Sequence, residues 1–272
     1  MPPLAPSRAS GAPGLRARLA SGQRLMGTWL TLADPAVAEL MAQAGMDFLT
    51  IDLEHSSLDL FQAAALIRVA ELSGAAPLVR LSDNDPVQIK RVMDAGAHGI
   101  IVPMVCAAAD VSRAWQALHY PPRGRRGVGL ARAQAYGEGF GAYRAWLDEQ
   151  AVLVAQIEHK DALAALDEIL AQPGLDAFLV GPYDLSASMG IAGQFEHPDF
   201  IAALEQILAA GRRHGVPAGV HVVEPDPVQL RARLDQGYRL VAWSVDFRML
   251  AAAARQGLAV LAASGGACSG SG

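Results

Sequence analysis

Two carboxylates each follow an apolar stretch of strand length. Glu158 comes after the run 152–155, in the motif Gln-Ile-Glu, and Asp184 comes after the run 177–180, in the motif Gly-Pro-Tyr-Asp. A carboxylate at the end of a buried strand is costly to desolvate unless it is paired or bound to a cation. Two of them on consecutive strands indicate oxygen ligands of one divalent ion, such as Mg²⁺ or Mn²⁺. The alternative is that Asp184 only caps the helix that follows it.

A second set of polar residues follows two earlier apolar runs. Asp52 and His55 close the second run, and Arg80 closes the run 75–79. His55 can act as a base whose imidazole is oriented by Asp52, and Arg80 can bind a substrate carboxylate or a developing enolate. The alternatives are that His55 belongs to a helix-entry turn and that Arg80 forms a structural salt bridge with Asp52 or Glu54.

Lysine usage separates two ways of activating a carbonyl group. The chain has two lysines, Lys90 and Lys160. A Schiff-base enzyme needs a desolvated lysine at the end of a strand. Lys90 lies at a polar position of the predicted helix 85–96, and Lys160 lies in a charged turn. Neither suits a Schiff base, so the electrophilic role falls to a metal.

The elements that must position these residues alternate along the chain. The expected strands are 25–30, 48–53, 77–81, 99–103, 152–157, 177–181, 217–222 and 239–245. Helices between them begin at Asp-Pro pairs and end at glycine, as in 34–45, 85–96 and 226–237. Eight such units predict an α/β protein of the (β/α)8 barrel (TIM barrel) type, in which the carboxyl ends of the strands meet at one mouth. A doubly wound sheet is less suitable, since no Gly-rich turn follows the first strand.

Composition narrows the class of protein. The 272 residues are 52% hydrophobic, with a net charge of −5. This balance, without a Lys/Arg cluster, excludes nucleic-acid binding, and no apolar run is long enough for a membrane span. Two cysteines form no disulfide framework, which favours a cytoplasmic protein. We expect a flexible tail at 1–14 without a signal-peptide core, one barrel domain at 15–263 and a flexible Gly/Ser tail at 264–272.

A series of motifs occurs in a specific order along most of the chain, from about Gly27 to Ala253. The motifs are Thr28-Trp29-Leu30, Ile51-Asp52-Leu53-Glu54-His55, Val79-Arg80, 84–90, 101–105, Tyr120-Pro121-Pro122, Arg126-Gly127-Val128-Gly129, Gln156-Ile157-Glu158 and 181–186. Together they resemble the metal-dependent pyruvate aldolases of the 4-hydroxy-2-oxoheptanedioate and 2-dehydro-3-deoxyglucarate type, in the HpcH/HpaI aldolase/citrate lyase family.

The resemblance implies roles for five residues. Glu158 and Asp184 would bind the divalent metal ion, which is Mg²⁺, Mn²⁺ or Co²⁺. His55 would act as the base together with Asp52. Arg80 would contact the carbonyl oxygen of pyruvate.

Substrate binding and assembly are also implied. Gln156 and the backbone around Gly181 and Tyr183 would hold the substrate carboxylate. The family implies a homo-oligomer, a hexamer built as a trimer of dimers, in which the eighth helix is exchanged between subunits. His159, Tyr183 and His221 depart from residues that are common in the family, so the preference for the aldehyde is the open point.

The implied activity is the reversible cleavage of a 4-hydroxy-2-oxo acid to pyruvate, or a close 2-oxo acid, and an aldehyde through a metal-stabilised enolate. One alternative is an acyl-CoA lyase of the citramalyl- or malyl-CoA type on the same barrel. It would need a basic CoA-binding surface, for which the loop with Arg123, Arg125 and Arg126 is the candidate. The other alternative is a non-catalytic oxo-acid-binding protein, which has no reason to keep the full set of site residues.

Overall fold

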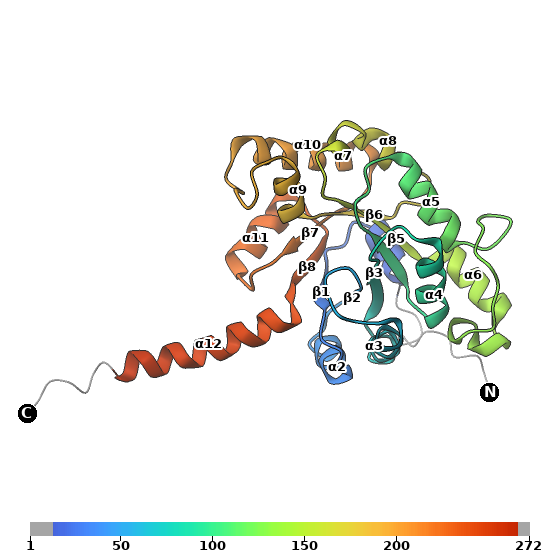
Figure 1. The fold of residues 1–272 in the computed structure, drawn as a ribbon, viewed down its shortest axis with the longest axis horizontal. Coiled ribbons are helices and arrows are strands. Elements are labelled where there is room, and N and C mark those ends of the chain that lie inside the picture. Colours follow the sequence, from blue (N-terminus) through green and yellow to red (C-terminus); the bar gives the residue numbers. More distant parts are fainter. Residues whose placement is uncertain (1–12, 266–272) are drawn as a thin grey trace, which may run out of the picture.

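Eight parallel strands close into a barrel in the computed structural model, which describes residues 13–265 (Figure 1). The strands are β1 Leu25–Leu30, β2 Phe48–Asp52, β3 Ala76–Arg80, β4 Gly99–Val102, β5 Val152–Ile157, β6 Ala177–Val180, β7 Ala218–Val222 and β8 Leu240–Val245. Each strand pairs with its neighbours in the sequence, and β8 pairs with β1. The predicted (β/α)8 barrel is confirmed, with each strand boundary within one residue of its predicted position.

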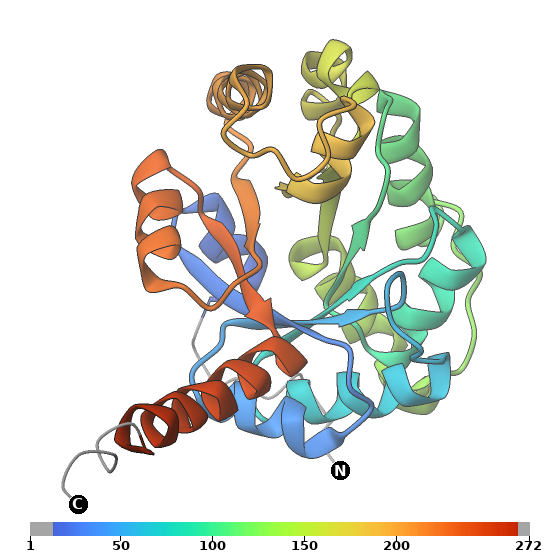
Figure 2. The same cartoon turned by 60° about the vertical axis from the view of Figure 1, so that its left-hand side comes forward.

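Helices surround the barrel and connect its strands (Figure 2). They are α1 Leu15–Ala20, α2 Pro35–Gln43, α3 Leu60–Leu72, α4 Pro86–Ala95, α5 Ala108–Leu118, the 3-10 helix η1 Arg132–Gly137, α6 Phe140–Gln150, α7 Asp161–Ala164, α8 Leu166–Leu170, α9 Pro182–Ser188, α10 Pro198–His214, α11 Pro227–Gln236 and α12 Asp246–Gly265. The predicted Asp-Pro starts are confirmed, because the carboxylates of Asp34, Asp85 and Asp226 each accept a backbone N–H from the first turn.

The hydrophobic core has an inner and an outer layer. The outer layer lies between the strands and the helices. The inner layer fills the barrel, where Leu15 and Leu19 of α1 join Leu25, Phe48 and residues at the beginnings of other strands. Helix α1 therefore closes the amino-terminal end of the barrel. The carboxyl ends of the strands, which carry the predicted site residues, stay free of this plug.

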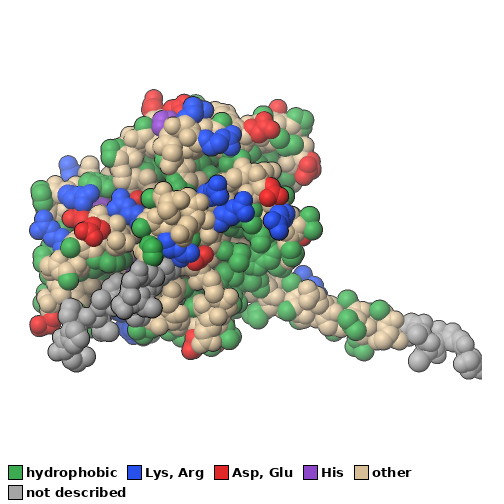
Figure 3. Space-filling view, turned by 180° about the vertical axis from the view of Figure 1, so that it is seen from behind, with side chains coloured by type: hydrophobic (Ala, Val, Ile, Leu, Met, Phe, Trp, Pro, Cys, Tyr) green, Lys and Arg blue, Asp and Glu red, His purple; other side chains and the backbone are tan. Residues whose placement is uncertain are grey.

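Helix α12 leaves the body of the molecule as an arm (Figures 1 and 3). It runs to Gly265, two positions past the predicted end of the domain at 263. The predicted tails lie mostly outside the described residues, at 1–12 and 266–272, and stay predictions. Within the described part of the chain, no helix is long and apolar enough to cross a membrane.

Candidate active site

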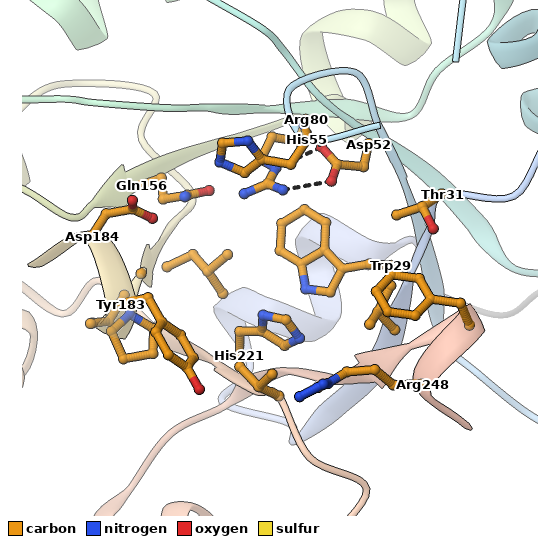
Figure 4. A pocket seen from close by; sticks show the side chains of 17 residues that line it. Trp29, Thr31, Asp52, His55, Arg80, Gln156, Tyr183, Asp184, His221 and Arg248 are labelled. Atoms are coloured by element: carbon orange, nitrogen blue, oxygen red, sulfur yellow. Dashed lines mark hydrogen bonds and ion pairs between the residues drawn. The ribbon is translucent and has the colours of Figure 1, made fainter. Parts of the chain in front are cut away.

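A cavity of about 340 Å³ opens at the carboxyl ends of the strands (Figure 4). The predicted site residues that line it are Asp52, His55, Arg80, Gln156, Gly181, Tyr183 and Asp184. Glu158 is the predicted residue that is not part of the lining. It lies directly behind Gly181, since a Cβ atom at this glycine would stand 2.8 Å from Glu158 Oε2. Residues from strands far apart in the sequence thus converge on one site, as the barrel predicts.

The guanidinium of Arg80 is held on three sides. Its Nε donates to Asp52 Oδ1 at 2.9 Å and its Nη2 to Asp52 Oδ2 at 2.6 Å. Its Nη1 lies 3.2 Å from Glu54 Oε2, and its Cζ lies 4.2 Å from the ring centre of Trp29. A guanidinium carries five N–H groups, so two are not engaged by Asp52 or Glu54. These contacts fix the position of the guanidinium at the cavity wall.

Asp52 is bound to Arg80 rather than to the imidazole that we expected it to orient. Its Oδ1 also accepts the backbone N–H groups of Glu54 and His55. Burial acts to raise the pKa of Asp52, but the hydrogen bonds and charge of Arg80 outweigh it and hold this pKa below its usual value. The imidazole of His55 is 62% exposed, with Nε2 3.8 Å from Glu54 Oε2. The salt-bridge alternative for Arg80 is therefore present, and the role of His55 as a base stays a prediction.

Glu54 is a member of this network that we expected only as a possible salt-bridge partner of Arg80. Burial raises its pKa to about 7; the charge of Arg80 opposes this, and the charges of Glu158 and Asp52 add to it. The sequence feature that could have revealed Glu54 is the two-residue period of a strand, which places Asp52 and Glu54 on one face. The guanidinium of Arg80 thus contacts two carboxylates that are largely shielded from solvent.

Glu158 is a buried carboxylate, 2% exposed. Its Oε1 accepts the backbone N–H of Met104 at 2.7 Å, and its Oε2 accepts a hydrogen bond from Gln156 Nε2. Met104 has a φ of 51°, a left-handed conformation that costs free energy in a residue other than glycine and that aims this N–H at the carboxylate. Burial raises the pKa of Glu158, and the charge of Asp184 raises it further.

This carboxylate pair fits a divalent cation. Among the described residues no arginine or lysine forms an ion pair with Glu158, and the buried Oε1 of Gln156 accepts no hydrogen bond. Asp184 stands in the first turn of α9, whose N-cap is Gly181, so the alternative that Asp184 is the N-cap is wrong. No group of three or more His, Cys, Asp or Glu that could hold a metal occurs in residues 13–265. A cation here would need water or substrate oxygens to complete its ligands.

Other polar residues near the strand ends have structural roles. Asp246, at the end of β8, accepts hydrogen bonds from the backbone of Thr31 and Leu32 and from Thr31 Oγ1, and so joins the end of β8 to that of β1. His159 accepts the backbone N–H of Asp161 in an outer turn and does not line the cavity. Conversely, Arg248 lines the cavity without having been predicted, because nothing in the sequence places the first turn of α12 at the mouth.

Comparison with known proteins gives one consistent family. The family model described as HpcH/HpaI aldolase/citrate lyase matches residues 25–253. A hydroxypyruvate/pyruvate aldolase of Roseovarius nubinhibens is 39% identical over 90% of this chain and 95% of its own length. A 4-hydroxy-2-oxo-heptane-1,7-dioate aldolase of Escherichia coli is also 39% identical, over 88% of this chain and 91% of its own.

A solved structure is similar over the same extent. The crystal structure of an HpcH/HpaI aldolase/citrate lyase family protein from Burkholderia cenocepacia superposes with a TM-score of 0.86. The two chains are 34% identical, and the match covers 91% of this chain and 98% of the other. Fold and sequence therefore point to the same relatives.

Proposed function

The chain belongs to the HpcH/HpaI aldolase/citrate lyase family, and on that premise we propose how its cavity works as the active site of a pyruvate aldolase. The chain is an aldehyde-lyase that acts on small molecules. It cleaves a 2-oxo acid with a hydroxyl group at C4 into pyruvate and an aldehyde. Its relatives are named as pyruvate and 4-hydroxy-2-oxo acid aldolases, which supports this reaction.

Glu158 and Asp184 are proposed to hold one divalent cation, Mg²⁺, Mn²⁺ or Co²⁺. When bound, such an ion supplies Lewis-acid polarisation of the keto group of the substrate. The support is a buried carboxylate that forms no ion pair with a basic side chain of the described chain. The charge of Asp184 raises its pKa, and the charge of Arg80 opposes this only from beyond ion-pair distance. Gln156 and the backbone of Gly181 and Tyr183 are proposed to hold the substrate carboxylate beside them.

The remaining steps are assigned to His55 and Arg80. In cleavage, His55 takes the proton of the C4 hydroxyl, directly or through one water, and the electrons of the O–H bond form the second C4–O bond of the aldehyde. The electrons of the C3–C4 bond pass into the C2–C3 bond, and negative charge develops on the C2 oxygen. The two free N–H groups of Arg80 stabilise this oxyanion, and a proton returned to C3 completes pyruvate. The held guanidinium at the cavity wall is the observation that carries the proposal.

Proton exchange at C3 of pyruvate tests this function without any aldehyde. We expect the metal-loaded protein to exchange the methyl protons of pyruvate for deuterium in D₂O, because Arg80 stabilises the enolate that exchange requires. The signal is the loss of the methyl resonance in ¹H NMR. A chain that cleaves only CoA esters, or that merely binds oxo acids, would leave the resonance intact.

The variant His55→Gln is the matched control for the base. The C4 hydroxyl is present in cleavage and absent from exchange, so cleavage should slow more than exchange in this variant. An equal loss in both reactions would instead assign His55 to binding or to the enolate step.

The acyl-CoA lyase alternative finds less support in the structure. Of the three arginines that could form a CoA-binding surface, Arg126 is buried and donates to Asp94, and Arg123 lies 3.1 Å from Asp148. One exposed arginine, Arg125, has no ion pair among the described residues. Most of the positive charge of this loop is therefore already used within the fold.

A hexamer that exchanges α12 between subunits is proposed as the assembly. The support is that every residue of α12 from 253 to 264 is exposed, and that Leu250, Leu258, Val260 and Leu261 are each more than half exposed. Figure 3 also shows hydrophobic side chains on the body near the base of the arm. Such an apolar helix needs a partner surface. A cytoplasmic location is proposed from cysteine usage alone.

Sedimentation equilibrium measures this assembly directly. We expect a mass of about six chains for the full-length protein and a smaller species when Leu258 and Leu261 are both replaced by Lys, because the charges would oppose burial of α12. A monomer for the unaltered chain would refute the exchange.

A further inference from the structure

His221 stands in the cavity wall with one ring nitrogen committed. Its Nε2 lies 3.1 Å from the carbonyl oxygen of Ser244, and a carbonyl only accepts, so Nε2 carries the proton. Nδ1 is then a lone-pair acceptor, and no hydrogen bond to it is found within residues 13–265. Burial lowers the pKa of His221 to about 4, so the ring is neutral at physiological pH.

The backbone of Ser244 fixes this tautomer. Ser244 has a φ of 51°, a conformation that non-glycine residues adopt at a cost. Its Oγ donates to the carbonyl of Val223 at 3.0 Å, which ties β8 to the end of β7, and its own carbonyl points at His221. The paired strands thus hold Ser244 in a strained conformation, and its carbonyl binds Nε2 of His221 and leaves Nδ1 as the acceptor.

Trp29 connects His221 to the proposed reacting centre. The centroids of the Trp29 and His221 rings lie 5.5 Å apart. Cζ of Arg80 lies 4.2 Å from the centre of the same Trp29 ring. Figure 4 shows the indole between Arg80 and His221, with the imidazole directed into the cavity. His221 therefore lies one side chain away from Arg80 in the lining of the same cavity.

The two arginines in the cavity lining each form an ion pair with a carboxylate. Arg248 also lines the cavity, and its Nη2 is bound to Glu224. Arg80 is bound to Asp52 and Glu54. Each arginine that lines the cavity is thus paired with a carboxylate that offsets its charge, while Nε of Arg248 has no hydrogen-bond partner among the described residues. The neutral acceptor Nδ1 suits a hydroxyl donor.

We propose that His221 is a specificity-determining residue that selects a 2-hydroxyaldehyde, whose hydroxyl donates a hydrogen bond to Nδ1. This inference rests on the proposed aldolase function and deepens it by naming the class of aldehyde. A site that hydrogen-bonds a substrate hydroxyl discriminates against the analogue that lacks it, because the polar atom of the site is left unpaired.

The test compares glycolaldehyde with propanal, which has a methyl group in place of the hydroxyl. The ratio of their kcat/KM values in aldol addition to pyruvate is measured for the unaltered chain and for His221→Leu. We expect this ratio to fall about tenfold in His221→Leu, the effect of one lost neutral hydrogen bond. Comparing ratios between variants cancels the different hydration of the two aldehydes in water.

Two further variants keep the test decisive. His221→Gln keeps an N–H group for Ser244 and an acceptor for the cavity, so it should return the ratio toward that of the unaltered chain. Val223→Ala removes volume from the same wall without removing a polar atom and should change both aldehydes alike. An unchanged ratio in His221→Leu, whether or not both aldehydes react more slowly, would overturn the proposal while pyruvate exchange persists. Absence of exchange in the unaltered chain would overturn the aldolase function itself.

Discussion

Replacement of Arg80 by alanine is expected to lower the kcat of aldol cleavage by about 10²–10³-fold, the usual loss when one preorganised oxyanion donor is removed. Arg80 is held by Asp52, Glu54 and Trp29, so its two free N–H groups need no reorganisation when charge develops on the substrate. Single-turnover cleavage of a 4-hydroxy-2-oxo acid measures the effect on the chemical step. Near-unaltered kcat in a folded Arg80→Ala protein would remove Arg80 from the enolate step.

The same variant, Arg80→Ala, also tests how much this arginine contributes to the stability of the fold. Its loss leaves the buried Asp52 carboxylate without its cation, which costs about 3–5 kcal/mol of folding free energy when such a pair is broken from one side. Urea unfolding at pH 7 measures this cost. The control is Arg80→Lys, which keeps the positive charge but loses the two-pronged bond to Asp52. We expect Arg80→Lys to be more stable than Arg80→Ala and still slow, which separates folding from catalysis.

Removal of divalent metal is expected to lower activity by at least about 10³-fold, since Lewis-acid polarisation is worth several kcal/mol. Exhaustive treatment with EDTA should abolish cleavage, and Mg²⁺, Mn²⁺ or Co²⁺ should restore it. Full activity in excess EDTA would contradict the assignment of Glu158 and Asp184. Trapping of pyruvate by borohydride on Lys160 would then indicate a Schiff base.

The variant Glu158→Gln ties the metal to this carboxylate. Glutamine keeps the shape of the side chain and an oxygen for the N–H of Met104, but it removes the charge. We expect Mn²⁺ binding, followed by electron paramagnetic resonance of the free ion, to weaken strongly in this variant. Asp161→Asn, on an exposed carboxylate of the neighbouring turn, is the matched control and should bind Mn²⁺ like the unaltered chain. Equal binding by Glu158→Gln would place the metal elsewhere.

The sequence alone determined the barrel and the list of residues at its mouth. Apolar runs of strand length, Asp-Pro helix starts and glycine stops are local signals, because propensity, capping and burial act over a few residues. Once eight βα units are recognised, geometry brings the ends of all strands together. For this reason Asp52, Arg80 and Asp184 were expected at one site before any contact was known, and they line one cavity.

Which of these side chains contact one another was decided by the tertiary structure. Asp52 and Arg80 face each other in the register of β2 and β3, and a bond across two strands outcompetes the imidazole three residues along the chain. Met104 reaches Glu158 only because the turn after β4 adopts a left-handed conformation beside β5. The tautomer of His221 depends on the backbone of Ser244, 23 positions away. Pairings of this kind depend on strand register and backbone angles set by the closed barrel, and a linear pattern of residue types contains neither.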